Sequence, residues 1–153
     1  MMSNILIICE NRKARHDYDI IETFEAGMAL MGSEVKSMRD KQMQLKDSYV
    51  IFKGDEAYLQ NAHIAEYKSS SYNNHVPERQ RKLLMHRHEL NKIYGALRER
   101  GLSCIPLKVY FKNGRAKIEV ALVKGRKTHD KRQAIKKRDE QREAAKSLQR
   151  SRR

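Results

Sequence analysis

Residues 105–122 read IPLKVYFKNGRAKIEVAL, a segment in which apolar and polar side chains alternate on either side of Asn113-Gly114. Asn-Gly favours a type I′ turn, which joins two antiparallel strands through a two-residue loop. This closure pairs Lys112 with Arg115, and the rest of the register follows by counting back from that pair. The predicted apolar pairs on one face are Val109 with Ile118, Leu107 with Val120, and Ile105 with Leu122.

The opposite face of this hairpin is expected to be polar, because Tyr110 opposes Lys117 and Lys108 opposes Glu119. The hairpin therefore predicts a sheet with one dry face and one charged, aromatic face.

The segments around the hairpin also favour short antiparallel strands with a few helices. We expect a strand over 19–30, a short helix capped by Ser33 and ending at Arg39, strands over 48–53 and 56–64, a mobile loop over 67–82, and an amphipathic helix over 85–100. This pattern predicts a mainly β, α+β protein, with a small closed or partly open antiparallel barrel and flanking helices.

The last 30 residues differ in composition from the rest of the chain. Residues 124–153 hold 13 Lys or Arg against four Asp or Glu, a net charge of +9 out of +14 for the whole chain. Their bulky apolar side chains, Ile135 and Leu148, are too few to offset the entropy of ordering the segment. We expect a folded body at 1–123 and a basic tail at 124–153, disordered alone and helical when docked on nucleic acid. A solvated tail that only promotes solubility is the alternative.

Three further basic clusters lie in the body. The first precedes the long strand and consists of Asn11, Lys13, Arg15, His16, Tyr18 and their neighbours. Its cations suit phosphates and its rings suit base stacking, although a basic lead-in to a strand is also common without any function. Lys36 and Arg39 share one face of the short helix. The third cluster, 79–82, is typical of a solvated loop.

The sequence argues against an enzyme and against a metal or cofactor site. It contains no Walker loop, GxSxG or HExxH motif, and His86 and His88 are two apart, which places them on different faces of a helix. His129 beside Asp130 resembles an acid/base couple, but the tail would not hold catalytic geometry. Without a transmembrane-length apolar run or paired cysteine spacing, we expect a cytoplasmic protein with reduced thiols and no membrane contact.

Six segments, in this order and combination, resemble one family. They are Asn11–Tyr18, Phe24–Gly27, Gly32–Ser37, Asp47–Val50, Arg81–Leu84, and Gly125–Lys127 with His129–Arg132. From about Asn11 to Arg142 the chain is similar to the small protein B (SmpB) family, the SsrA-binding proteins of bacterial trans-translation.

The resemblance implies a fold and a function. The fold is an oligonucleotide-binding-type β-barrel with flanking helices and a basic tail. The barrel would bind the tRNA-like domain of transfer-messenger RNA, supporting its aminoacylation by alanyl-tRNA synthetase and its delivery with elongation factor Tu and GTP. The tail would enter the empty mRNA channel and decoding centre of stalled ribosomes, contacting RNA of the small subunit. The protein would be a non-catalytic adaptor.

The resemblance also implies roles for single residues. It ties Glu25, Leu84 and Lys117 to binding of transfer-messenger RNA. A carboxylate such as Glu25 on an RNA-facing surface suits base amines or orients a nearby cation, and Leu84 is expected to shape the surface by packing. Lys117 suits a phosphate, and Tyr110 on the same face offers a plane for stacking. His86 replaces an asparagine frequent in the family, and it can still donate or stack.

In the tail, the resemblance assigns the decoding-centre motif to His129, Asp130, Lys131 and Arg132. Further tail contacts are expected from Lys127, Lys136, Arg138 and Leu148. The match loosens beyond Arg142, because Ser147 and Leu148 stand where the family places two larger apolar residues. The strongest rival interpretation is a ribosomal or ribosome-assembly protein with an RNA-binding barrel, which would stay on every ribosome.

Overall fold

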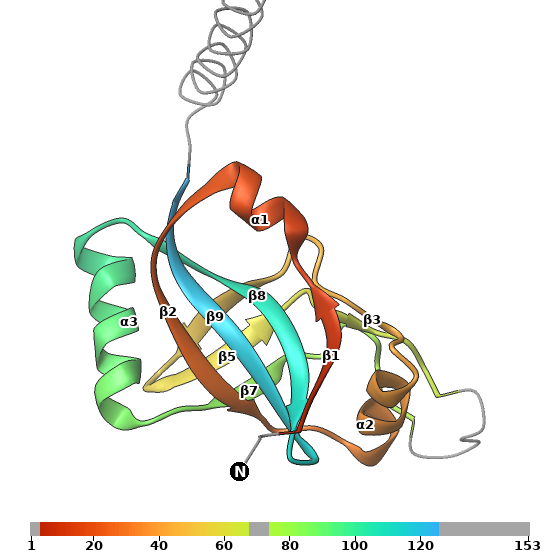
Figure 1. Cartoon of the computed structure of the whole chain (residues 1–153). Coiled ribbons are helices and arrows are strands. Elements are labelled where there is room, and N and C mark those ends of the chain that lie inside the picture. The colour runs from red at the N-terminus through yellow and green to blue at the C-terminus, as the bar shows by residue number, and fades with distance from the viewer. Residues whose placement is uncertain (1–3, 68–73, 126–153) are drawn as a thin grey trace, which may run out of the picture.

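A computed structural model describes residues 4–67 and 74–125, which form mostly antiparallel strands with three helices (Figure 1). In chain order the elements are β1 Ile5–Glu10, α1 Arg12–Asp17, β2 Tyr18–Met28, α2 Gly32–Arg39, β3 Met43–Gln44, β4 Tyr49–Lys53, β5 Glu56–Gln60, β6 His63–Ile64, β7 Arg81–Leu84, α3 Arg87–Glu99, β8 Ser103–Lys112 and β9 Arg115–Gly125. The mainly β, α+β class is as predicted. Strand β1 was not predicted, although its apolar run is evident in the sequence.

Seven strands form one curved antiparallel sheet in the order β1-β8-β9-β2-β7-β5-β4, and β3 pairs with β6 in a second small sheet. No hydrogen-bonded ladder among the described strands joins β1 to β4, so the sheet is not closed into a barrel. Of the two predicted forms, closed or partly open, the closed one is therefore wrong. The sheet nevertheless curls (Figure 1), and β4 packs against β8.

The turn between β8 and β9 is the one predicted. Asn113 and Gly114 have φ values of 52° and 79°, the left-handed conformations that a type I′ turn requires. Lys112 pairs with Arg115, and the expected pairing continues through Val109 with Ile118 and Lys108 with Glu119.

Beyond Lys108 the predicted register is wrong, because β8 contains a bulge. Val120 pairs with Pro106 rather than Leu107, and Leu122 pairs with Cys104 rather than Ile105. Proline has no N–H to donate to the ladder, and bulges are one of the places where a sheet tolerates it.

The bulge divides the apolar residues between two cores. Because a shift of one residue reverses the face to which a side chain points, Ile105 and Leu107 face away from the main core. They pack with Ala14 of α1, and with Ala121 and Val123, in a small second core. The main core fills the concave side of the sheet and includes Phe24, Leu59, Leu83, Ile93, Val109, Ile118, Val120 and Leu122. The prediction of a single dry face is therefore wrong at the α1 end of the hairpin.

Two local predictions about helices differ from the structure. Met31, not Ser33, is the N-cap of α2, and the carboxylate of Glu34 accepts a hydrogen bond from the Met31 backbone N–H at 2.8 Å. Ser33 lies inside the helix and bonds His75 instead. Helix α3 has the expected apolar face, with Leu90 and Ile93 buried, and Gly101 follows its end at φ 63°.

The predicted loop over 67–82 is shorter than expected, because Arg81 and Lys82 belong to β7. Cys9 and Cys104 are both free, in agreement with the expected thiols. No helix of the described chain is long and apolar enough to cross a membrane.

Candidate RNA interface

A surface groove of about 530 Å³ lies where β2 and β7 meet the start of α3. The two strands are joined there by the pairing of Gly27 with Leu84. A Cβ on Gly27 would lie 3.4 Å from the Leu84 Cβ, so the backbone of β2 passes close beneath this side chain. The groove is lined by Glu25, Gly27, Glu56, Lys82, Leu83, Leu84, Met85, His86, Arg87, Glu89, Leu90 and Lys117. It therefore brings together four predicted site residues from three separate segments.

Among the apolar residues that line this groove, Leu84 is the exposed one. Strand β7 alternates, with Arg81 and Leu83 pointing inward and Lys82 and Leu84 toward the groove, and Leu84 is 52% exposed. Leu84 was expected to shape the surface by packing, and with half of its side chain exposed it is also available for direct contact.

Glu25 of β2 is fixed by contacts from the neighbouring hairpin. Its Oε2 accepts a hydrogen bond from the Tyr110 hydroxyl and lies 3.6 Å from the Lys112 Nζ. The hydrogen bond from Tyr110 is the main cause that lowers the pKa of Glu25; burial opposes it, while the charges of Lys112 and Lys117 lower the pKa further. Glu25 is therefore a carboxylate at neutral pH, although part of it remains exposed to the groove.

Tyr110 does not offer the stacking plane predicted for it. Its side chain is only 5% exposed, with the Lys108 Nζ 5.6 Å from the ring centroid. Burial, reinforced by the hydrogen bond to Glu25, raises the pKa of Tyr110 well above its ordinary value. What Tyr110 contributes to the groove is the hydrogen bond that its hydroxyl donates to Glu25.

The charged side chains of the groove are mixed, three Lys or Arg against three Glu, and its cations include two that were not predicted as site residues. Lys117 lies on β9, paired with Gly27 on one side and Tyr110 on the other. Lys82 and Arg87 also line the groove, where the Lys82 Nζ lies 2.8 Å from Glu56 Oε1. Lys82 was part of the basic segment 79–82, whose alternation along β7 was the missed signal.

At the start of α3, His86 is the N-cap residue and lies against His88. Their rings stack with centroids 5.7 Å apart and planes 10° apart. The prediction that the two histidines point to different faces is wrong, because His86 has an extended backbone and precedes the helix. Both side chains are exposed, and His86 lines the groove.

The front cluster lies on α1, at the end of β2 away from the groove (Figure 1). Lys13, Arg15 and His16 are exposed there. Asn11 is hydrogen-bonded to β8: its Nδ2 donates to Pro106 O at 3.0 Å, and its backbone N–H donates to Leu107 O at 2.7 Å. Tyr18 packs against the second core.

Lys36 and Arg39 are exposed on α2, and neither lines the groove. The Lys36 Nζ lies 5.5 Å from the Tyr67 ring centroid, and the Arg39 guanidinium lies 6.0 Å from that of Phe111. Apart from Tyr110, which is buried on β8, the body residues predicted to bind RNA therefore occupy three places: the groove, α1 with its two cap residues, and α2.

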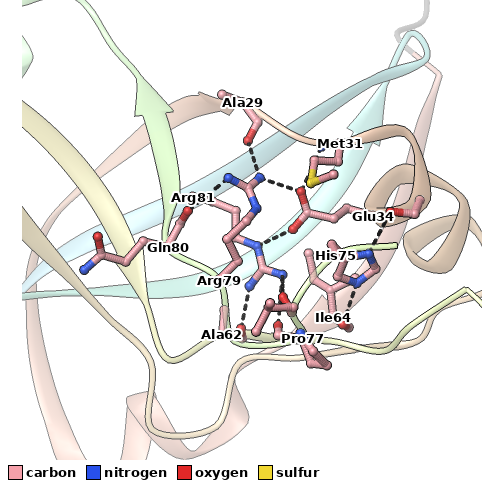
Figure 2. Close-up of polar contacts among 12 residues, drawn as sticks. Ala29, Met31, Glu34, Ala62, Ile64, His75, Pro77, Arg79, Gln80 and Arg81 are labelled. Atoms are coloured by element: carbon pink, nitrogen blue, oxygen red, sulfur yellow. Dashed lines mark hydrogen bonds and ion pairs between the residues drawn. The ribbon is translucent and has the colours of Figure 1, made fainter. Parts of the chain in front are cut away.

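The segment 79–82, predicted as a solvated basic loop, links the groove strand β7 to α2. Arg81 is fully buried, and its Nε donates to Glu34 Oε2 at 2.6 Å (Figure 2). Arg79 donates to the other oxygen of Glu34 at 2.5 Å, and Arg81 also donates to Ala62 O at 2.7 Å and Pro77 O at 2.9 Å. The interpretation of Arg81 as solvated is wrong: its guanidinium ties α2 to β7, whose next residues face the groove.

A buried histidine completes this network. His75 Nε2 lies 2.8 Å from Ile64 O and its Nδ1 lies 2.9 Å from the Ser33 hydroxyl (Figure 2). Because a carbonyl oxygen only accepts, Nε2 donates to Ile64 O, and Nδ1 shares a second hydrogen bond with the Ser33 hydroxyl. The network therefore anchors α2 at a second point.

Within 4–67 and 74–125, no three His, Cys, Asp or Glu side chains gather in a way that would hold a metal ion. The tail predictions, from Lys127 to Leu148, lie outside the described residues. The predicted boundary between 123 and 124 falls within β9, which continues through Gly125.

Comparison with known proteins gives a consistent result. The family model described as SmpB protein matches residues 8–150. An SsrA-binding protein of Bdellovibrio bacteriovorus is 73% identical over 152 residues, covering 99% of this chain and all of the relative. That of Syntrophobacter fumaroxidans is 54% identical over 137 residues, covering 90% of this chain and 85% of the relative. A solved structure described as "tmRNA-SmpB: a journey to the center of the bacterial ribosome" is 46% identical, with a TM-score of 0.68, and covers 83% of this chain and 93% of that one.

Proposed function

The chain belongs to the SmpB protein family, and on that premise we propose that it binds transfer-messenger RNA and acts with it in trans-translation. The groove of Glu25, Leu84, His86 and Lys117 takes the tRNA-like domain of that RNA. The observation that carries this proposal is the convergence of these four residues, from three separate segments of the chain, on one accessible surface that Lys82 and Arg87 also line.

The chemistry of the groove suits a folded RNA. Lys82, Arg87 and Lys117 supply charge for phosphates, whereas Leu84 offers an exposed apolar side chain to the face of a base or sugar. Glu25 repels phosphate and accepts from base N–H groups, so it favours a particular placement of the RNA. The groove thereby combines affinity from cations with selectivity from a carboxylate.

The basic tail does a second job. Lys127, His129, Asp130, Lys131 and Arg132, followed by Lys136, Arg138 and Leu148, enter the empty mRNA channel and decoding centre of a stalled ribosome. The tail is disordered alone and folds as a helix there, since its composition provides charge for RNA but no core. The exposed cations of α1 and α2 provide further contacts to RNA.

The partners follow from this role. Transfer-messenger RNA and the small-subunit RNA of stalled ribosomes bind the protein directly, in the cytoplasm. Alanyl-tRNA synthetase and elongation factor Tu with GTP act through the bound RNA. The protein is a non-catalytic adaptor that leaves the chemistry to these partners, and the curled sheet with flanking helices serves as an oligonucleotide-binding-type body.

A paired assay tests this function. Filter binding to the tRNA-like RNA measures capture, and tagging on a message without a stop codon measures rescue. Lys117→Ala should lower capture first, whereas Arg115→Ala, which removes one cation from the same strand outside the groove, should have a smaller effect.

Replacing His129, Asp130, Lys131 and Arg132 together by alanine should leave RNA affinity within a few-fold, since only two Lys or Arg are lost among 33. The same variant should fail to tag. If it tags normally, the tail is only a solubility or affinity appendage and the decoding-centre role falls. If Lys117→Ala and Arg115→Ala weaken capture equally, the groove is not the binding site.

A further inference from the structure

We propose that Tyr110 is a positioning residue for RNA recognition: its buried hydroxyl holds Glu25 as an oriented carboxylate that accepts a hydrogen bond from a nucleobase N–H donor. This inference rests on the proposed function of the groove and adds to it the device that sets the groove's selectivity.

The placement of Tyr110 leaves it one polar function. The residue lies on β8 and its ring is buried on the outer face of the sheet, while Glu25 lies two strands away on β2. The Tyr110 side chain spans β9 beside Lys117 and reaches Oε2 of Glu25. A buried ring with a tethered hydroxyl restricts the rotamers of the carboxylate it contacts, so Glu25 pays less entropy to order when RNA binds.

The surroundings of Glu25 make this constraint necessary. Glu25 pairs directly across the sheet with Glu119, a like charge that disfavours holding the carboxylate ionised at this position. Glu119 is drawn toward Lys108, 3.9 Å away, while Tyr110 and Lys112 act on Glu25. Lys117, on β9, lowers the pKa of Glu25 through its charge. The Tyr110 hydroxyl thus donates a hydrogen bond to Oε2, and the Lys112 Nζ lies 3.6 Å from the same oxygen.

The carboxylate's remaining acceptor capacity specifies the ligand. Tyr110 and Lys112 both lie against Oε2, and no described residue donates a hydrogen bond to Oε1, so Oε1 is left as an acceptor for a ligand in the groove that Glu25 lines. A phosphate has no proton to donate at neutral pH and carries like charge, so it is excluded. A base edge with an amine or ring N–H supplies the donor, and the flanking Lys82 and Lys117 accommodate the phosphates on either side.

The test is a thermodynamic cycle in the full-length protein, using Tyr110→Phe, Glu25→Ala and the double variant. Binding is measured to the tRNA-like RNA and to an unrelated RNA of the same length. Tyr110→Phe should weaken binding to the tRNA-like RNA by about three- to tenfold, and should change it less than about twofold when Glu25 is already alanine. Binding to the unrelated RNA should not fall in either variant. Tyr94→Phe, which loses a hydroxyl contact with Arg98 outside the groove, is the matched control and should bind as the unaltered protein does.

The pH profile separates positioning from a purely structural effect. The hydrogen bond from Tyr110 lowers the pKa of Glu25, so affinity should be retained above that pKa and lost as pH falls through it. Tyr110→Phe raises this pKa, so its affinity should begin to fall at a higher pH than that of the unaltered protein. The difference should vanish in the Glu25→Ala background.

Three results would overturn the inference. One is unchanged affinity for the tRNA-like RNA in a folded Tyr110→Phe protein. The second is full additivity of the two substitutions, and the third is the same pH midpoint with and without the hydroxyl. If Tyr110→Phe does not fold, a carboxyl-carbon NMR titration of the unaltered protein replaces it: Glu25 must then titrate below the ordinary range of a glutamate side chain. A protein that did not discriminate the two RNAs at all would overturn the proposed function as well.

Discussion

Glu34 and Arg81 are charged side chains with no exposed surface, and each depends on the other for its burial. Burial would raise the pKa of Glu34, but hydrogen bonds from Arg79, from the Met31 backbone N–H and from Arg81 outweigh it and hold the pKa below its ordinary value. A carboxyl whose pKa is lowered by folding stabilises the protein above its unfolded pKa, and this contribution is lost as pH falls through the folded pKa. Acid should therefore loosen α2 from β7.

Glu34→Gln keeps the size of the side chain but leaves two guanidinium groups without their carboxylate. We expect it to lower the free energy of unfolding by about 3–5 kcal/mol, because the Arg81 charge stays buried. Urea unfolding at neutral pH measures this. Glu22→Gln is the control, since its ion pair with Lys92 is exposed and should change stability by less than about 1 kcal/mol. Equal effects of the two substitutions would contradict the account of the network.

Leu84 and Leu83 are adjacent residues that should behave in opposite ways. Leu83 is 2% exposed and belongs to the main core, so Leu83→Ala should lower the free energy of unfolding by about 2–5 kcal/mol. Leu84→Ala should change stability little, but it should weaken binding to the tRNA-like RNA, since it removes an exposed contact from the groove. Thermal unfolding and filter binding of both variants check this. A large loss of stability in Leu84→Ala would show instead that Leu84 acts by packing.

Single residues also show what could and could not be predicted from the sequence. Glu25, Leu84, His86 and Lys117 were brought to attention by resemblance to a family, and the structure places them in one groove. Arg81 was misjudged because its partner, Glu34, is 47 residues away, and nothing local distinguishes a buried cation from a solvated one. Tyr110 was placed on the face opposite Val109, yet its burial and its hydrogen bond to Glu25, 85 residues away, were not predicted.

At the scale of elements, the attachment of α1 to the bulge in β8 is the least predictable feature. The Asn113-Gly114 turn and the pairs next to it follow from local conformational preferences. The bulge does not follow from these preferences. Apolar and polar residues keep alternating through Pro106 in the sequence, whereas β8 has one extra residue there relative to β9. Its two carbonyls, of Pro106 and Leu107, are then free to accept from Asn11. Register thus depends on a contact nearly 100 residues away.

Asn11→Ala tests this attachment. It removes the hydrogen bond from Nδ2 to Pro106 O and keeps the backbone bond to Leu107 O, so stability should fall by about 1 kcal/mol. Amide hydrogen exchange in α1 should become faster, while exchange in α3 stays unchanged. Asn91→Ala, on the exposed face of α3, serves as the control and should not destabilise. Unchanged exchange in α1 would show that Asn11 is not its anchor.

At the scale of the whole molecule, the two proposed RNA contacts lie at opposite ends of β2. Tyr18 pairs with Gly125, where β9 ends beside α1, and Gly27 pairs with Lys117 and Leu84 at the groove (Figure 1). The nine steps between Tyr18 and Gly27 correspond to about 30 Å of extended strand. Because the groove lies this far from Gly125, where β9 ends, substitutions in the groove and beyond Gly125 should have additive effects on RNA affinity.

The central claim is that this body and tail serve one particular RNA. The most direct measurement is to recover the full-length protein from bacterial cells and sequence the RNA that remains bound, with Lys117→Ala in parallel. We expect transfer-messenger RNA to dominate the RNA bound to the unaltered protein and to decrease in the variant. Ribosomal RNA should be recovered with the protein only from stalled ribosomes. Ribosomal RNA in equal amounts on all ribosomes, without enrichment of transfer-messenger RNA, would contradict the account and identify a constitutive ribosomal component instead.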